Sequence, residues 1–284
     1  MGNRGLFKIL GVKISFPIGL GWGLFLFLVS GCSNQANTEH LIRMAGSSTV
    51  LPIATKAAEK FRESQSGVKI TVSPGGSGVG VRSLGNGLID IGMVSRTLSE
   101  EERVRFPTVK FISNVIAKDA VAVVVSSEIY DAGVTELSGE INNWKELGGP
   151  DREILCIDKE VHRGTRHVFM EYFFNDPTGV AKGADIVSGS NNEELTKITL
   201  SDSAIGMLSA AWANQDVKDI GLKNNGKTVY PTKENIRNGV YPISRDLIFL
   251  TNGEPRGKVK GFIDFLLGEA GQKIIEESGY VSLH

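Results

Sequence analysis

Residues 42–61 read IRMAGSSTVLPIATKAAEKF and join a short apolar segment, through a Gly-Ser-Ser-Thr turn, to an amphipathic segment. Apolar residues in the second part recur at spacings of three and four, which predicts a helix. Ser48 or Thr49 can cap this helix, and Pro52 suits its first turn. We therefore expect a strand, a loop rich in hydroxyl groups and a helix, in that order.

The alternation of strand and helix continues along the chain. Strands are expected at 68–72 and 89–94, and a glycine-rich loop at 74–80 opens a short helix between them. Another helix is expected to start at Ser99, where acidic residues fill the first turn. A run of valine and alanine at 120–126 indicates a fully buried strand. This rhythm predicts a parallel sheet wrapped by helices, hence an α/β fold.

A second α/β segment is expected to follow, up to about residue 241. It contains the segment 134–149, a strand at 154–157 and a helix at 165–174. A further strand at 241–251 and one long helix at 259–277 complete the chain.

The first 31 residues carry three charges, on Arg4, Lys8 and Lys13, before an apolar run at 14–29. This pattern fits a secretory signal better than a membrane span. The run ends in Val-Ser-Gly-Cys at Cys32, which resembles a bacterial lipobox and implies lipid on that cysteine. The alternative is an uncleaved N-terminal anchor helix. Both interpretations place the rest of the chain outside the cytoplasmic membrane.

The composition is that of a folded soluble domain. The 284 residues are 41% hydrophobic and 22% charged, with a net charge of −1. The apolar fraction excludes a disordered chain, and the balanced charge gives no support to nucleic-acid binding. Two cysteines do not make a disulfide scaffold. With Cys32 lipidated, Cys156 stands alone in an apolar run and is expected to be a small buried hydrophobe.

Three loops rich in Ser, Thr and Gly open predicted helices, at 46–49, 76–78 and 163–165. Helix N-termini expose unpaired N–H groups and a partial positive charge, so their convergence would suit a tetrahedral oxyanion. Each loop alone is equally consistent with an ordinary helix cap or a turn. Arg96 follows the predicted strand at 89–94, and it can bind phosphate or lie at the surface. The nucleotide motifs GxxxxGK[ST] and GxGxxG are absent from the sequence.

Taken together, the chain resembles the substrate-binding proteins of phosphate-specific ABC transporters, in their shorter bacterial form. The resemblance spans about residues 42 to 284 in seven ordered blocks: 45–52, 75–80, 90–96, 139–149, 164–166, 241–245 and 262–266, with a tail at 279–281.

The resemblance implies a two-lobe α/β fold of the type II periplasmic-binding-protein superfamily, each lobe a sheet flanked by helices, joined by a hinge. It implies a signal peptide at 1–31 and a tether at 32–40. The first lobe would be 41–118 with about 245–284, and the second 119–244. By position, the phosphate contacts would be Ser48, Thr49, Val50, Ser77, Ser95, Arg96, Lys159, Arg163, Gly164 and Thr165.

The same resemblance implies a receptor held by a lipid anchor on the cell membrane, facing the periplasm or the cell exterior. It would bind inorganic phosphate and deliver it to the membrane subunits of an ABC importer. We expect a monomer without cofactor, metal or nucleic-acid partner.

The second-lobe loop departs from the family pattern. Lys159 stands where the family has arginine, His162 where it has glycine, and Arg163 where it has serine. Lysine keeps the charge but loses the bidentate fork, while the arginine can supply a new guanidinium or point outward. The longer relatives have an aspartate where this chain has Ser95. Glu160 can replace that carboxylate in rejecting sulfate, or it can pair with a neighbouring cation.

Two alternatives to phosphate transport remain open on the sequence. A receptor or sensor for another oxyanion would use the same fold. A phosphate-ester hydrolase would need a nucleophile or a metal pair, and the sequence contains no GxSxG motif and no zinc-helix spacing of histidines. We therefore do not expect an enzyme.

Overall fold

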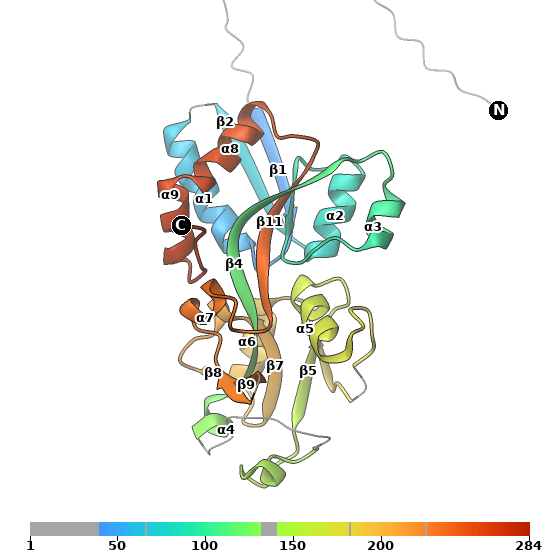
Figure 1. Cartoon of the computed structure of the whole chain (residues 1–284), viewed down its shortest axis with the longest axis vertical. Coiled ribbons are helices and arrows are strands. Elements are labelled where there is room, and N and C mark those ends of the chain that lie inside the picture. The colour runs from blue at the N-terminus through green and yellow to red at the C-terminus, as the bar shows by residue number, and fades with distance from the viewer. Residues whose placement is uncertain (1–39, 66, 132–140, 182, 225) are drawn as a thin grey trace, which may run out of the picture. The chain divides into compact units, whose positions relative to one another are not determined.

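The structure is a computed structural model that describes residues 40–65, 67–131, 141–181, 183–224 and 226–284. The predicted signal peptide, Cys32, the tether up to residue 39 and the predicted segment 134–140 lie outside the described residues. The described chain has the predicted α/β class, with two groups of elements linked by two long strands (Figure 1). We call these groups the first lobe and the second lobe.

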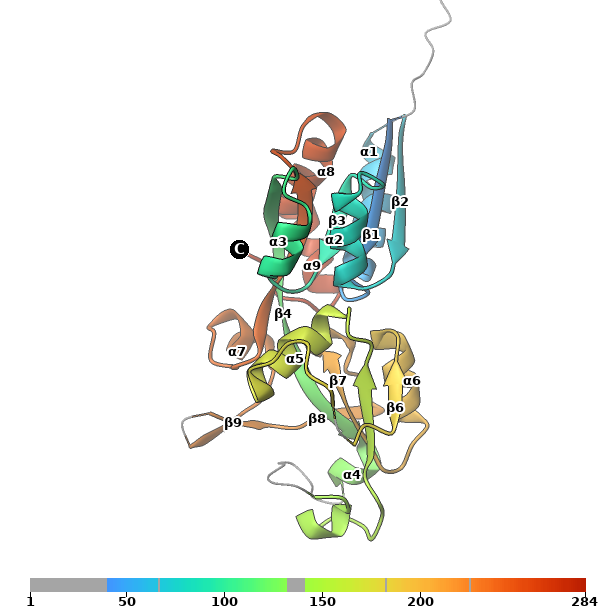
Figure 2. The same ribbon diagram turned by 90° about the vertical axis from the view of Figure 1, so that its right-hand side faces the viewer.

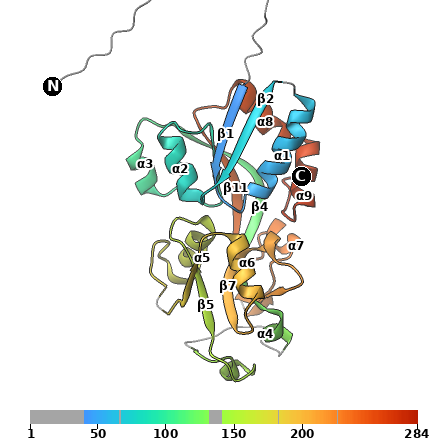
Figure 3. The same cartoon turned by 180° about the vertical axis from the view of Figure 1, so that it is seen from behind.

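The first lobe is built on three parallel strands. β1 (His40–Gly46) lies between β2 (Val68–Pro74) and β3 (Ile91–Val94). Helices cover both faces of this sheet (Figures 1 and 3). One face carries α1 (Leu51–Ser64), α8 (Gly257–Leu267) and α9 (Glu269–Glu277), and the other carries α2 (Ser77–Gly85) with α3 (Glu100–Arg105) beside it.

The second lobe repeats this plan with a different strand order. β5 (Leu155–Lys159) lies between β6 (Ile186–Ser188) and β7 (Ala204–Ser209) and is parallel to both. Figure 2 shows α5 (Gly164–Phe174) and α6 (Asn191–Thr199) on opposite faces of these strands. The smaller elements are α4 (Ser127–Asp131), η1 (Trp144–Leu147), η2 (Ala210–Trp212), β8 (Val217–Asp219), β9 (Leu222–Asn224), β10 (Lys227–Val229) and α7 (Lys233–Arg237).

Two antiparallel strands join the lobes. β4 (Phe111–Ser126) pairs along 111–120 with β11 (Ser244–Asn252), and along 121–125 with β7. Within the described residues one sheet therefore runs β2-β1-β3-β11-β4-β7-β5-β6. The predicted boundary after residue 118 falls within β4, and the predicted boundary after residue 244 falls at the start of β11. The exact lobe boundaries stay a prediction.

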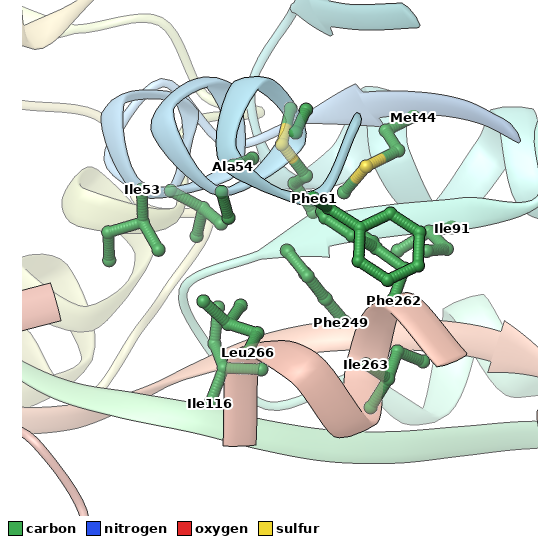
Figure 4. Close-up of a cluster of buried hydrophobic side chains, with 14 of the residues drawn as sticks. Met44, Ile53, Ala54, Phe61, Ile91, Ile116, Phe249, Phe262, Ile263 and Leu266 are labelled. Carbon is green, nitrogen blue, oxygen red and sulfur yellow. The ribbon is translucent and has the colours of Figure 1, made fainter. Parts of the chain in front are cut away.

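The main core lies between the first-lobe sheet and the helices α1, α8 and α9. Phe262 is fully buried there, with its ring 5.4 Å from that of Phe61 and 5.8 Å from that of Phe249 (Figure 4). Full burial of such a side chain stabilises the fold by about 1.5–3 kcal/mol. This core includes Val50 and so fixes the turn that leads into α1, where Ser48, Thr49 and Val50 of the predicted site lie.

Three predictions about the fold need correction. The predicted helix at 259–277 is two helices, because extended backbone at Gly268 separates α8 from α9. The strand predicted at 120–126 begins nine residues earlier, at Phe111, since its first part is only partly buried and lacks a continuous apolar pattern. The sheet is mixed and not wholly parallel, because β11 is antiparallel to both β3 and β4.

Candidate functional site

Five strands end at the junction between the lobes. β1, β2 and β3 end just before Ser47, Ser77 and Ser95, and β5 and β6 end before Thr165 and Asn191. The carboxyl ends of parallel strands are the usual ligand-binding edge of an α/β sheet. Figures 1 and 2 show α2 and α5 facing each other across this junction. The chain therefore gathers hydroxyl and amide side chains from both lobes at one place.

In the first lobe, three serine hydroxyls form a buried chain of hydrogen bonds. The Ser47 hydroxyl accepts the Thr49 N–H at 3.2 Å and donates to Ser95 Oγ at 2.9 Å. Ser77 Oγ lies 3.3 Å from Ser95 Oγ and accepts the Ser95 N–H at 3.1 Å. Ser77 and Ser95 are both 0% exposed. The structure thus places Ser77 and Ser95 together, and it adds Ser47, which our site prediction had left out.

Thr49 and Thr165 meet across the two lobes. Their hydroxyl oxygens are 3.5 Å apart, and the Asn191 amide donates to Thr49 Oγ1 at 3.0 Å. Gly164 explains why the lobes come this close, because a Cβ at that position would overlap the hydroxyls of Ser77 and Ser95. The predicted residues Thr49, Gly164 and Thr165 therefore belong to one cluster. We call the hydroxyl-bearing residues of this cluster, Ser47, Thr49, Ser77, Ser95 and Thr165, the hydroxyl cluster.

A buried arginine from the joining strands also contacts the hydroxyl cluster. Arg245 on β11 donates to Thr165 Oγ1 at 3.1 Å and to Thr49 Oγ1 at 3.3 Å, so it touches both lobes. Asp119 on β4 holds the guanidinium at 3.0 and 2.7 Å. Ser209 in turn donates to the other Asp119 oxygen at 2.9 Å. The site prediction missed Arg245, although it lies in the 241–245 block that carries the family resemblance.

The three cations that the sequence predicts as ligand contacts are each paired with a carboxylate. Arg96 donates to both oxygens of Glu102, at 2.8 and 2.7 Å. Burial raises the pKa of Glu102, but the hydrogen bonds and charge of Arg96, with the Ser99 N–H, outweigh burial and leave that pKa lowered. Arg163 donates to Glu160 at 2.8 and 2.5 Å, so its guanidinium turns to its own loop.

Lys159 forms a buried ion pair with Glu194 and also lies 3.4 Å from the Ser190 carbonyl oxygen. The other partners of this glutamate are the Ser188 hydroxyl and the Met207 N–H. Burial lowers the pKa of the lysine and raises that of the glutamate, and their mutual attraction opposes both changes. The lysine that stands where the family has arginine is therefore engaged with partners inside the second lobe.

Ser48 and Val50 are placed differently from the other predicted contacts. Ser48 is half-buried, and Val50 is fully buried in the first-lobe core with its N–H donated to the Ser47 carbonyl at 3.2 Å. The predicted cap of α1 is wrong: the N-cap position is Val50, and no side chain caps the helix. The turn at Ser47 places the N-cap one residue beyond Thr49, and the helix itself begins at Leu51.

The N-termini of α1, α2 and α5 all lack a side-chain cap. Uncapped helix starts leave backbone N–H groups and the positive end of the helix dipole for an anion. The backbone also links the lobes here, because the Gly78 N–H donates to the His162 carbonyl at 3.1 Å. The arrangement is therefore suited to hold a small anion between donors from both lobes.

Over the described residues, no group of three or more His, Cys, Asp and Glu side chains is placed to hold a metal ion. His167 lies near Arg96 and Glu102, where burial and then the arginine charge lower its pKa to about 4. Among the described residues, no helix has both the length and the apolar composition that a membrane span requires.

Comparison with known proteins agrees with this geometry. Residues 33–270 match the model of a PBP superfamily domain. A curated relative, the phosphate-binding protein PstS of Borreliella burgdorferi, is 33% identical over 269 residues, covering 90% of this chain and 94% of the relative. The chain therefore belongs to the PstS family of phosphate-binding proteins within the PBP superfamily.

Solved structures have the same fold. A substrate-binding protein from Clostridium perfringens with bound phosphate superposes with a TM-score of 0.76 at 28% identity, covering 86% of this chain and all of that one. An ABC-type phosphate transport receptor from Vibrio cholerae superposes with a TM-score of 0.65 at 29% identity, covering 84% of this chain and 99% of that one. These likenesses confirm the predicted periplasmic-binding-protein-like fold.

Proposed function

We propose that this chain is an extracytoplasmic receptor that binds inorganic phosphate and delivers it to the membrane subunits of an ABC importer. The observation that carries the proposal is the meeting of Thr49, Ser77, Ser95 and Thr165 at uncapped helix starts from both lobes. These groups donate hydrogen bonds to an oxyanion, as the family membership leads us to expect. The chain binds its ligand without turnover.

Binding and closure are coupled in this proposal. A ligand favours the closed arrangement only if it binds that arrangement more tightly than the open one. Phosphate would do so because its oxygens contact Ser77 and Ser95 from one lobe and Thr165 from the other. Arg245 takes part by ordering the hydroxyls of Thr49 and Thr165. The closed receptor then docks on the importer.

Anchoring is a separate part of the proposal. Lipid on Cys32 would hold a monomeric receptor on the outer side of the cell membrane, with residues 32–40 as tether. The variant Cys32→Ala should release the protein from membranes into the soluble fraction, with phosphate binding unchanged. Membrane retention of that variant would show that the N-terminal segment itself is the anchor.

Calorimetric titration with phosphate tests the binding function. The full chain, stripped of ligand in detergent, should bind phosphate with a micromolar or tighter Kd, about −8 kcal/mol. Ser77→Leu should abolish binding because the larger side chain fills the hydroxyl cluster. Ser64→Leu is the matched control and should bind phosphate normally. Ser64 is exposed and lies at the C-terminal end of α1, far along the helix from the site. Absence of binding by the unmodified chain, or normal binding by Ser77→Leu, contradicts the proposal.

A further inference from the structure

Charge is unevenly distributed between the two ends of the fold. The chain after residue 31 has 28 Lys and Arg against 32 Asp and Glu, so an even distribution would make its whole surface weakly acidic. The end of the first lobe that lies away from the junction departs from this average. β1 and β2 begin there and α1 ends there (Figure 1). The start of β4 and the end of β11 meet at the same end, where the Lys110 N–H donates to the Asn252 side chain at 3.1 Å.

Five basic residues gather at this end of the first lobe. Lys258, in the first turn of α8, donates to the Gln65 amide oxygen at 3.3 Å, just beyond the end of α1. Lys69 lies beside the first residues of β1 in the register of the sheet. All five are exposed except Lys258, which is half-buried. We call this group the basic end: Arg62, Lys69, Lys110, Arg256 and Lys258.

The acidic residues near the basic end are mostly neutralised by other cations. Three of them are held in ion pairs at 2.6–3.2 Å: Glu63 with Lys60, Asp264 with Lys260, and Asp90 with Arg43. Among the described residues, this leaves Glu59 and Glu254 against the five cations of the basic end. The basic end therefore has a net positive charge, on a chain whose overall charge is negative.

The opposite end of the fold, in the second lobe, is acidic. β4 ends there and β5 and β7 begin there, so this end also lies away from the junction. Arg152 pairs with two of its acids, at 2.6 and 3.3 Å, and Lys145 pairs with a third at 2.8 Å. We call its six exposed acids the acidic end: Glu128, Glu146, Asp151, Glu153, Asp202 and Asp216. The fold therefore has a charge dipole that runs from one lobe to the other.

The chain enters the fold at the basic end. His40 is the first residue of β1, and the sequence before it leads back to Cys32 and the apolar run 14–29. A tether of nine residues, 32–40, spans at most about 30 Å. An anchor on either side of Cys32 therefore keeps this end near the membrane. Leu41, at the same point of the surface, is 48% exposed and places an apolar side chain beside the cations.

We propose, building on the anchoring part of the proposed function, that the basic end rests on the anionic phospholipid headgroups of the membrane. A basic residue close to an anionic membrane strengthens binding about fivefold, and this attraction falls off within a Debye length of about 10 Å. The same field repels the acidic end. Membrane charge thus holds the receptor by one end, with the second lobe turned outward, instead of leaving it free on its tether.

The test uses the full chain, anchored by its own N-terminal segment in vesicles of phosphatidylcholine with or without phosphatidylglycerol. Flotation shows first that the chain is retained on both kinds of vesicle. Acetylation of lysines, measured by mass spectrometry, then reports which end is covered. Lys69 and Lys258 should react at least about fivefold more slowly on the anionic vesicles, whereas Lys145 at the acidic end should react equally on both. Salt at about 1 M should remove the difference, because it shortens the Debye length to about 3 Å.

A matched pair of charge variants separates docking from mere closeness to the membrane. Arg62→Glu/Arg256→Glu reverses two cations of the basic end, and Lys145→Glu/Lys227→Glu makes the same change in net charge on exposed residues of the second lobe. Both variants keep the tether and should bind phosphate normally in detergent, which shows that they are folded. On anionic vesicles the first variant should lose the protection of Lys258, and the second should keep it.

Three results would overturn the inference and leave phosphate binding untouched. They are equal acetylation of the unmodified chain on neutral and anionic vesicles, equal protection of Lys258 in the two variants, and protection of Lys145 in place of Lys258. A chain that floats with neither kind of vesicle would overturn the anchoring and this inference together, and titration with phosphate in detergent would still decide the binding function.

Discussion

Replacing Arg245 with methionine is the sharpest single test of how the site is built. The variant keeps the length of the side chain and removes the guanidinium that holds Asp119 at 2.7 Å. Both side chains are almost fully buried, at 3% and 1% exposed. Removing one partner of a buried ion pair leaves an uncompensated charge and costs about 3–5 kcal/mol of stability. The Ser209 hydroxyl would be the remaining partner of the aspartate.

The same change should weaken phosphate binding. Thr49 and Thr165 each lose an incoming bond from Arg245, at 3.3 and 3.1 Å, and are free to turn away from the ligand. Hydrogen bonds to charged groups are worth about 1.5–3 kcal/mol each, so losing two should raise the phosphate Kd more than 100-fold. Urea denaturation followed by circular dichroism measures the first effect, and calorimetric titration measures the second.

Two further variants separate charge from position. Arg43→Met breaks an exposed pair with Asp90 and should leave the urea midpoint almost unchanged, with normal binding. The double variant Asp119→Leu/Arg245→Met removes both buried charges, so it should recover much of the stability lost in Arg245→Met but none of the binding. The reasoning is refuted if Arg245→Met unfolds at the same urea concentration as the unmodified chain, or if the double variant binds phosphate normally.

Three other perturbations probe single features. Gly164→Ala places a Cβ onto the hydroxyls of Ser77 and Ser95, and calorimetry should show phosphate binding weakened at least about tenfold. Gly261→Ala is the control. Gly261 lies inside α8, and an added Cβ would lie an ordinary 3.8 Å from Phe61 Cζ. This variant should stabilise the fold by about 1 kcal/mol in urea denaturation, with phosphate binding unchanged. Asp219 has an unpartnered buried oxygen, and burial raises its pKa from 3.8 to about 6. The folded state therefore holds this proton more tightly, so the charge destabilises the fold above pH 6 and this effect fades as pH falls toward 4. Urea denaturation should show Asp219→Asn more stable than the unmodified chain at pH 8, with the difference shrinking at pH 5. Burial, with the charge of Asp185, raises the pKa of Cys156, so iodoacetamide should alkylate this thiol more slowly in the native chain than in urea.

Each of these outcomes has an opposite that would count against the structure. Equal binding by Gly164→Ala would mean that the lobes do not approach at that residue. A stability difference for Asp219→Asn that is the same at pH 5 and pH 8 would mean that the aspartate is solvated. Equal alkylation rates for Cys156 in the native and unfolded chains would place the thiol in water.

Local sequence signals predicted the parts of the site that lie between a strand and the first turn of the helix that follows it. Ser77, Ser95 and Thr165 follow β2, β3 and β5, and hydrophobic periodicity with glycine-rich loops is enough to locate such positions. The break at Gly268 was also visible as a glycine, but the apolar pattern on both sides of it favoured one long helix. The positions of these site residues along the chain could therefore be predicted better than the residues at which each helix or strand begins and ends.

Partners far apart in the sequence could not be predicted. Arg245 and Asp119 are separated by 126 positions, and Lys159 meets Glu194 only because α6 packs on the sheet to which β5 belongs. The local sequence around a charged residue does not indicate which distant residue will form its ion pair. The same limit explains Arg96, which the sequence offers as a ligand contact and the structure pairs with Glu102.

The position of β11 in the sheet affects the order in which the chain can fold during its synthesis. This strand lies between β3 and β4 in the sheet, yet among the described strands it is the last to be synthesised. Until residues 244–252 emerge, β3 and β4 each present an unpaired edge, and exposed edges favour pairing with other chains. A chain cut short before Ser244 would therefore be an aggregation hazard although it contains all of the second lobe. Closure of the sheet between β3 and β4 therefore depends on the nine residues of β11.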